Sequence, residues 1–419
     1  MNNINKFKRK SIVALVLTPL LFFCFQVNGQ SAPEGKISGE VRISLREEKL
    51  AAKLKYDYVA AGENEAAVKF FIGEDFTVRK VECGNCRSFN IDRQTKPAPA
   101  LLIDLKKPLS KGERLSINID YDGSLKNIYR KEHEFLELGL DNFWFPIHPG
   151  FSQFNFVYKV SIKTEETNLY LVSNGRTTRK GSGWVVESKV PDYDIDLVLG
   201  KNLKFNTYQE DGYNIQVVSK NLPPETPSTL LANIREILEF YNATFNSGKP
   251  QREVTAVLRP FGESAGQGGY FRKGYFILPK YDDAQVYFFP VAHELAHYWF
   301  IAAGREHAWL NESFAEYAAM LALRRKRGIE AFNAILERKI KNNVNLPAVY
   351  GFDRNKNPRQ SPMVLYVKGP LKLNELEKML GEPQFMEFLQ AVAAAKVKDT
   401  DRLIELLAQT VSRDVAENF

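Results

Sequence analysis

Two histidines and a glutamate in the second half of the chain have the spacing of a metal site. In the segment His293-Glu294-Leu295-Ala296-His297 the histidines are four residues apart, so on an α-helix both imidazoles project from one face and can reach one ion. Glu294 lies on an adjacent face, where a carboxylate can accept a proton from a water molecule beside the metal. The alternative is a chance match, with all three side chains solvated at the surface. The flanking residues are apolar, however, and burying such groups without a purpose is costly, which favours a metal site.

A catalytic zinc site needs a third protein ligand, and a second predicted helix offers one. Pro290 suits the first turn of the helix with the two histidines, and Gly304 suits the position just past its end. A further helical pattern starts near Leu310, with Glu312 in its first turn. If the two helices pack as a helix–loop–helix, Glu312 faces the first one. Glu316 lies one turn further along and shares that face, so periodicity alone does not separate the two glutamates.

Three segments together resemble a known family. They are H-E-L-A-H-x-W-F at 293–300, W-L-N-E-x-F-A at 309–315 and Y-x-K-G at 366–369. This set resembles the aminopeptidase N family of zinc metallopeptidases, gluzincins that also include leukotriene hydrolase. The resemblance implies an N-terminal antiparallel, saddle-like β-domain followed by an α+β, thermolysin-like catalytic domain that is mostly helical towards the C-terminus. It also implies one Zn²⁺ ion and these roles: zinc ligands His293, His297 and Glu312, general base Glu294, and oxyanion donor Tyr366.

The spacing of the glutamate ligand departs from the family pattern. Fourteen residues separate His297 from Glu312, and the longer interval usual in the family would end on Glu316 instead. We assign Glu312 as the ligand because it is the glutamate of the W-L-N-E segment and because a loop can lose a few residues at little cost. Glu316 is then expected to hydrogen-bond a ligand histidine from behind.

A second departure concerns the substrate. Aminopeptidases of this family hold the free amine of a peptide with the glutamate of a G-x-M-E-N strand, and here the corresponding place contains Gly268 and Gly269. Glycine permits close approach of an extended substrate backbone, so these two residues are the expected substrate-binding strand. Without the glutamate, the preference for a free N-terminus is expected to be weak or absent. The chain also lacks the C-terminal helical domain of longer relatives, which predicts a more open site.

Three functions are compatible with these residues. The first is hydrolysis of peptide bonds in a peptide or protein, as an aminopeptidase or an endopeptidase. The second is a non-catalytic peptide-binding protein on a peptidase scaffold, which the missing glutamate would allow. The third is a zinc hydrolase of a small non-peptide substrate such as an ester or epoxide. Glu294 and Tyr366 favour a catalyst, since holding zinc requires neither.

The elements that position these residues follow from the hydrophobic period. From about residue 36 to 208, short runs alternate polar and apolar residues, which predicts a β-rich domain at 30–208. Turn signals within it include 61–64, 121–123 and 180–183, and Asn-Gly at 174–175 predicts a hairpin. From 209 to 419, a last group of strands is interleaved with a helix near 228–245, and helical patterns dominate after Pro290.

The N-terminus has the pattern of a targeting segment. A basic start at Lys6–Lys10 precedes an uncharged apolar stretch from Ser11 to Val27, and small or polar residues follow near Gly29. We expect a cleaved signal peptide at 1–29, and therefore an exported protein, periplasmic or extracellular, with no stable membrane span after cleavage. The alternative is a retained membrane anchor. Removal of these residues lowers the formal charge from +7 to about +3, with 53 basic against 50 acidic residues, so nucleic acid is not an expected partner.

Two cysteines outside the targeting segment, Cys83 and Cys86, form a C-x-x-C within a strand-rich region. A zinc knuckle begins this way but needs a second pair of ligands. A local disulfide across a turn is the favoured interpretation in an exported chain, with a free thiol pair as the alternative.

Overall fold

The computed structural model describes residues 35–150, 154–188, 190–245, 248–262, 268–354 and 356–419. The expected signal peptide at 1–29 lies outside these residues, so that prediction stays untested. The described segments all belong to one compact unit, residues 33–419.

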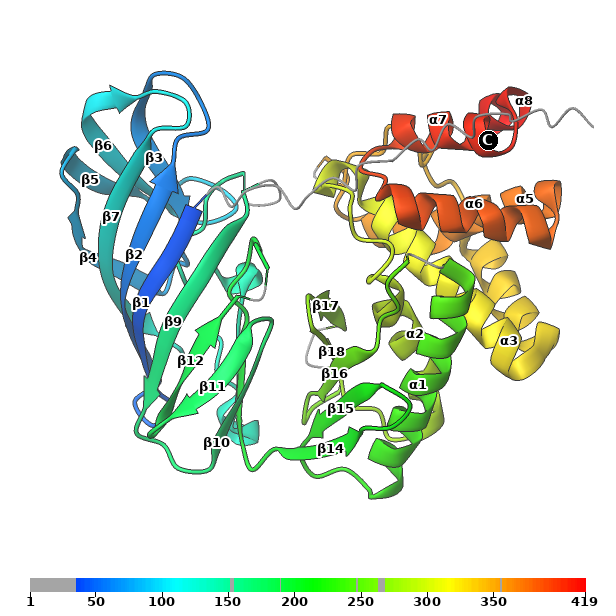
Figure 1. The fold of residues 1–419 in the computed structure, drawn as a ribbon, viewed down its shortest axis with the longest axis horizontal. Coiled ribbons are helices and arrows are strands. Elements are labelled where there is room, and N and C mark those ends of the chain that lie inside the picture. The colour runs from blue at the N-terminus through cyan, green and yellow to red at the C-terminus, as the bar shows by residue number, and fades with distance from the viewer. Residues whose placement is uncertain (1–34, 151–153, 189, 246–247, 263–267, 355) are drawn as a thin grey trace, which may run out of the picture. The chain divides into compact units, whose positions relative to one another are not determined.

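The N-terminal half is built from strands in three sheets (Figure 1). The seven-stranded sheet has the order β11 (Arg176–Lys180), β12 (Gly183–Glu187), β9 (Phe156–Thr164), β1 (Gly35–Ser44), β2 (Lys49–Val59), β7 (Arg114–Ser124) and β4 (Phe76–Glu82). One three-stranded sheet contains β3 (Glu65–Phe71), β6 (Ala100–Leu109) and β5 (Cys86–Asp92); the other contains β10 (Leu169–Ser173), β13 (Leu197–Lys201) and β8 (Phe135–Leu138). All neighbours in these sheets are antiparallel except β1 and β9.

Alternation of side chains explains these strands. In β2, every second residue from Leu50 to Tyr58 is buried, and the lysines between them face solvent. One face of the sheet therefore packs on the core and the other is solvated, which is the common arrangement in antiparallel sheets. The predicted β-rich domain is confirmed.

Two of the turn predictions hold and two are wrong. Residues 61–64 link β2 to β3, and 181–182 close the hairpin of β11 and β12. Tyr121–Gly123 instead lies inside β7, where Gly123 is needed because a side chain there would collide with Phe76 of the neighbouring β4. The predicted Asn174–Gly175 hairpin is also wrong, since β10 and β11 belong to different sheets. The Asn174 side chain is buried and bonds Tyr158, Asp192 and the main chain of 194–196, so tertiary contacts override the local signal.

The C-terminal half begins with a five-stranded sheet in the order β14 (Lys204–Tyr208), β15 (Asn214–Ser219), β16 (Glu253–Leu258), β18 (Tyr275–Leu278) and β17 (Tyr270–Arg272). Strands β15, β16 and β18 are parallel, whereas β14 and β17 are antiparallel edges. The domain change predicted at 208/209 falls between β14 and β15, within this sheet.

Helices make up the rest. They are α1 (Glu225–Phe245), α2 (Phe288–Ala296), α3 (Ala308–Asn342), α4 (Ser361–Met363), α5 (Gly369–Leu380), α6 (Glu382–Ala395), α7 (Thr400–Thr410) and α8 (Arg413–Asn418), with a π-helical turn η6 at Val364–Lys368. Helix α1 contacts β15 and α2, and α2 and α3 pack on each other. Their apolar side chains form one buried cluster with the sheet. The α+β fold with a helical C-terminal part is confirmed.

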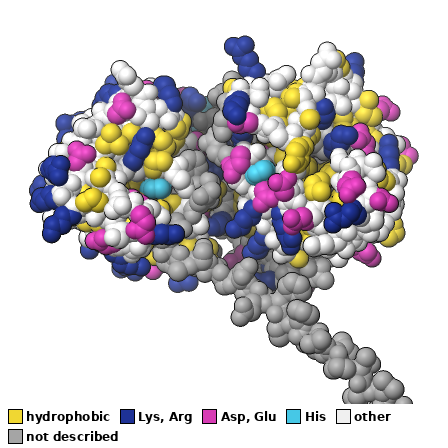
Figure 2. Space-filling model, turned by 90° about the horizontal axis from the view of Figure 1, so that it is seen from above, with side chains coloured by type: hydrophobic (Ala, Val, Ile, Leu, Met, Phe, Trp, Pro, Cys, Tyr) yellow, Lys and Arg dark blue, Asp and Glu magenta, His cyan; other side chains and the backbone are white. Residues whose placement is uncertain are grey.

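Two further features concern the surface. Within the described residues, no helix has both the length and the apolar character needed to cross a membrane. On the face seen in Figure 2, basic side chains are interspersed with acidic ones.

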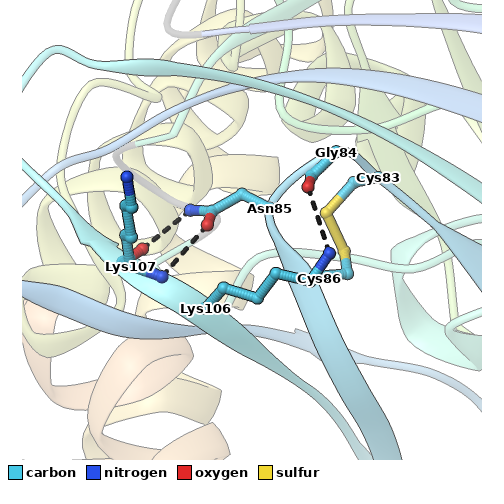
Figure 3. Close-up of a disulfide and its surroundings, with 6 residues drawn as sticks. All are labelled: Cys83, Gly84, Asn85, Cys86, Lys106 and Lys107. Atoms are coloured by element: carbon cyan, nitrogen blue, oxygen red, sulfur yellow. Dashed lines mark hydrogen bonds between the residues drawn. A yellow bond between two sulfur atoms is a disulfide. The ribbon is translucent and has the colours of Figure 1, made fainter.

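The Cys83–Cys86 disulfide is present, as predicted. It spans the turn between β4 and β5, and Figure 3 shows the intervening Asn85 directed at the neighbouring strand. The Asn85 amide donates to the Lys107 carbonyl at 2.7 Å and accepts from the Lys107 N–H at 3.0 Å. The disulfide closes the turn, and the two Asn85 hydrogen bonds fasten it to β6.

Candidate metal centre and catalytic site

Helix α2 carries the first two candidate ligands in its last turn. His293 and Glu294 lie within the helix, and His297 lies at its C-cap with helical dihedral angles (φ −62°, ψ −17°). The helix was expected to continue towards Gly304, and this is wrong. After Ala296 the chain tightens into a turn, and the Phe300 carbonyl comes back to within 3.2 Å of the His297 Nδ1. That contact requires the chain to leave the helical path.

The fold brings together the three predicted ligands. The candidate ligand atoms of His293, His297 and Glu312 all lie within 4.8 Å of one another, and both histidines are buried. Glu312 Oε2 is 3.5 Å from His293 Nε2 and 3.8 Å from His297 Nε2. Ligand atoms of a tetrahedral zinc site, at metal–ligand distances of about 2.0–2.2 Å, are separated by about 3.4 Å. The residues therefore fit a zinc ion with little rearrangement.

The two imidazoles are oriented by groups behind them. His293 Nδ1 is 3.0 Å from Glu316 Oε2, and His297 Nδ1 is 3.2 Å from the Phe300 carbonyl. Each acceptor favours a proton on Nδ1, so that Nε2, on the side of Glu312, is the nitrogen that can bind a metal ion once it carries no proton. Carboxylate or carbonyl partners of this kind set the tautomer of metal-binding histidines. Glu316 thus makes the contact expected of it, whereas Glu312 lies near both Nε2 atoms.

Charge in the cluster favours a divalent cation. Burial alone would lower the pKa of His293, but the carboxylates of Glu312 and Glu316 outweigh it and raise this pKa to about 10. Burial opposes ionisation of Glu312, yet the hydrogen bond from His293 and the charge of both histidines lower its pKa to about 2. His293 and Glu312 thus share a proton because the carboxylates here outnumber the positive charges. A metal ion can supply that positive charge in place of the proton.

Glu294 is the unpaired carboxylate of the site. It is 6% exposed, and its Oε2 is buried without a hydrogen-bond partner among the residues that the structure describes. Burial raises its pKa to about 7, with the positive charge of His293 acting in the opposite direction. A carboxyl group whose pKa lies near neutrality is suited to accepting and returning a proton.

Tyr366 approaches from a different element. It lies in η6, a π-helical turn between α4 and α5, and its hydroxyl donates to Glu312 Oε2 at 2.8 Å. The residue is 37% exposed, so part of it faces solvent while its hydroxyl contacts the ligand cluster. π-Helical turns are rare and occur frequently at functional sites.

Gly268 and Gly269 were expected in a strand, but they directly precede β17, which begins at Tyr270. A Cβ atom on Gly269 would be 2.6 Å from Glu294 Oε1, whereas one on Gly268 would meet nothing within 4 Å. The Gly268 carbonyl accepts a hydrogen bond of 2.5 Å from Arg259 Nη1, and the same guanidinium binds Glu137 of β8 with two bonds of 2.6 and 2.8 Å. A cavity of about 390 Å³ adjoins these residues.

A buried group of charges adjoins the same strand. Arg272 in β17 pairs with Asp196 at 2.9 Å and with Asp194 at 3.2 Å. Burial raises the pKa of both aspartates, and Arg272 only partly offsets it. One guanidinium thus pairs with two buried carboxyl groups, and burial opposes the ionisation of both.

Comparison with known proteins identifies the C-terminal half. Residues 279–418 match the model of the peptidase family M1 domain. This part of the chain is a peptidase family M1 domain. The match contains all the candidate ligands and Tyr366, so this domain carries the residues of a metallopeptidase with one zinc ion. The resemblance drawn from the sequence is confirmed.

Solved M1 structures share the fold of both halves. The M1 zinc metallopeptidase from Deinococcus radiodurans is 16% identical, with a TM-score of 0.66 and coverage of 92% of each chain. Yeast LTA4 hydrolase is also 16% identical, with a TM-score of 0.71 over 92% of this chain and 67% of that one. No curated protein sequence matches this chain.

Sequence reasoning missed several residues around the M1 site. Arg259 and Arg272 stand in strands, where nothing local shows that their partners come from β8 and from 194–196. Lys339 was also missed, although a signal was present. It follows Phe332 and Leu336 at helical spacing, and both of these are buried. A lysine on a buried helix face needs a partner.

Proposed function

We propose that this M1 protein hydrolyses peptide bonds in peptides or proteins, with His293, His297 and Glu312 holding the zinc ion. When bound, zinc polarises a carbonyl group and increases the acidity of a water molecule beside it. Glu294 accepts the proton of that water at its carboxylate and returns it to the departing amine. Tyr366 donates a hydrogen bond to the carbonyl oxygen as negative charge develops there.

The observation that carries this proposal is the buried Glu294 Oε2, which has no hydrogen-bond partner among the described residues. Holding zinc requires only the three ligands, and a buried carboxylate oxygen without a hydrogen-bond partner, such as Glu294 Oε2 among the described residues, is costly unless it has a use. Glu294 and Tyr366 both border the ligand cluster without being needed for it. A purely binding protein would gain nothing from either group.

The test compares the wild-type protein with Glu294→Gln in a digest of a peptide library, with zinc measured on both. We expect cleavage to fall by about 10²–10⁴-fold while zinc content stays unchanged. If the wild type cleaves nothing although zinc is bound, the result supports a non-catalytic binding protein. Turnover of ester or epoxide probes without peptide cleavage would support a hydrolase of small substrates.

We further propose that a free N-terminus is not required in the substrate. The M1 glutamate for the substrate amine is replaced by glycine, and Gly269 has no room for a side chain beside Glu294. The Deinococcus protein has been solved with a Tyr-Ser-Ala substrate, so a short peptide fits that relative. Matched peptides with free and acetylated N-termini should be cleaved at rates within a few-fold of each other. A strong preference for the free amine would contradict this.

The choice of Glu312 over Glu316 as ligand is testable by zinc content. Glu312 Oε2 lies near both histidine Nε2 atoms, whereas Glu316 contacts the Nδ1 of His293 and the Lys339 ammonium. We expect Glu312→Ala to lose zinc and Glu316→Ala to retain it with weaker affinity, by about 10–100-fold. The opposite order would show that the assignment is wrong.

We also propose that the protein acts outside the cytoplasm, in the periplasm or beyond. The basic and apolar start of the chain and the Cys83–Cys86 disulfide support this, because disulfides persist in oxidising compartments. Cell fractionation with sequencing of the mature N-terminus tests it. Full-length protein in the cytoplasm would contradict the proposal.

A further inference from the structure

Lys339 is a buried lysine at the back of the metal site. It is 8% exposed, and its ammonium group lies 2.5 Å from Glu316 Oε1 and 2.6 Å from the Tyr366 carbonyl oxygen. A buried ammonium group is stable only when paired and hydrogen-bonded. Both of its partners belong to the catalytic site, so the location of this charge is not explained by packing alone.

Each partner leads directly to the ligand cluster. Glu316 uses its other oxygen, Oε2, to hold His293 at 3.0 Å. Tyr366 reaches Glu312 through its hydroxyl at 2.8 Å, and Glu312 lies 3.5 Å from His293. These contacts form a closed ring with Lys339 on the side remote from the ligand atoms. Displacement of the ammonium group would therefore change the positions of both a ligand histidine and Tyr366.

The contact with the Tyr366 carbonyl has a structural reason. In the π-helical turn the regular i to i−4 bonds are interrupted, so carbonyl groups become available to side chains. Ser313 Oγ donates to the Leu365 carbonyl at 2.7 Å, and Lys339 donates to the next one. Ser313 and Lys339 thus fasten two successive peptide groups of the segment that presents the tyrosine.

A break in helix α3 makes the contact between Lys339 and Glu316 possible. Gly328 has φ 85° and ψ 176°, which is outside the helical region and in a range that favours glycine. The chain changes direction there, and the segment after it returns Lys339 to Glu316, 23 residues earlier in the same element. A straight helix would carry residue 339 about 35 Å away from residue 316.

We propose that Lys339 is a positioning residue that sets the orientation of His293 through Glu316 and the position of Tyr366 through its main chain. The expected effect of Lys339 on zinc affinity depends only on the presence of the metal site. The consequence for the rate rests on the proposed function.

The experiment compares Lys339→Met with wild type and with Lys341→Met, a control on the same helix whose lysine is exposed. Zinc affinity is measured by competition with a chelator, the ligand geometry by the absorption spectrum of the cobalt-substituted protein, and turnover by peptide cleavage. For Lys339→Met we expect zinc affinity to fall by about 10–100-fold, as for other groups that support metal ligands. The cobalt spectrum should change, and kcat should fall with little change in KM. Lys341→Met should match wild type in all three.

A wild-type zinc affinity and cobalt spectrum in folded Lys339→Met would overturn the proposal. If that variant does not fold, Lys339→Arg decides the matter, because it keeps the charge but displaces the donor. A shifted cobalt spectrum with several-fold weaker zinc binding supports the proposal, and wild-type values overturn it. Should no form of the protein cleave peptides, the zinc and cobalt measurements still decide the role of Lys339 independently of the proposed function.

Discussion

Replacing Gly269 with alanine adds a single methyl group beside the carboxylate of Glu294. The new Cβ would be 2.6 Å from Glu294 Oε1, 2.8 Å from Leu278 Cδ2 and 3.1 Å from the Ile277 carbonyl oxygen. Ordinary contacts begin at 3.4 Å, so one of these neighbours must move. The Ile277 oxygen belongs to the backbone of β18, which leaves the Leu278 and Glu294 side chains to move.

The displacement sets the expected size of the effect. To restore an ordinary contact, Glu294 Oε1 has to retreat by about 0.8 Å, the difference between 3.4 and 2.6 Å. Misplacing a reacting group by about 1 Å costs up to about 10²-fold in rate. We therefore expect kcat to fall by about 10–100-fold, equivalent to about 1.4–2.7 kcal/mol of transition-state stabilisation. Crowding should also reduce the free energy of unfolding by about 1–3 kcal/mol.

Gly268→Ala is the matched control, because its Cβ would meet nothing within 4 Å. Both variants would be assayed for zinc content, urea unfolding and cleavage of the same peptide pool. Gly268→Ala should keep kcat within a few-fold of wild type, and zinc should stay bound in both variants. If Gly269→Ala retains the wild-type kcat with zinc bound, the proximity of Gly269 to Glu294 does not control catalysis, and the reasoning fails.

Three other perturbations have defined outcomes. Tyr366→Phe should lower kcat by about 10²–10³-fold with zinc content unchanged, and wild-type turnover would exclude the tyrosine as an oxyanion donor. Burial raises the pKa of Asp196 above its unfolded value of 3.8, with Arg272 opposing and Asp194 adding to the rise, so its stabilising contribution is complete below about pH 4 and is lost as pH rises. Asp196→Asn should reduce the fall in Tm between pH 5 and pH 8, which differential scanning calorimetry can measure. Replacing Cys83 and Cys86 with serine should reduce the free energy of unfolding in urea by about 2 kcal/mol, as expected for so short a loop; unchanged zinc affinity is expected alongside.

Much of the site could be predicted because its residues are local in sequence. The histidines and Glu294 occupy one helix, and a spacing of four residues fixes their faces wherever that helix lies. Glu312 and Glu316 could be placed on the facing helix but not ranked, since both share one side of it. Their ranking needed the position of α3 against α2, which puts one carboxylate at the Nε2 atoms and the other at an Nδ1.

Errors in the predicted fold came where distant contacts outweigh local preference. Asn174 has the residue type of a hairpin turn. Its buried hydrogen bonds to residues far along the chain instead hold it in the connection between two sheets. Gly123 resembles a turn residue but serves close packing within a strand. Helix α2 ends early because a carbonyl is needed behind His297.

The sequence by itself determined the helix with the two histidines and the β-then-α order of the fold, because both follow from short-range spacing and residue type. Glu316 was expected behind a ligand histidine, but only the tertiary structure showed which histidine it contacts and which groups hold Glu316 and Tyr366. The ring of Lys339, Glu316 and Tyr366, and the pairing of Arg259 with Glu137, join residues separated by 23 to 122 positions. Such contacts depend on how elements pack, and no local period encodes the partner of a buried charge.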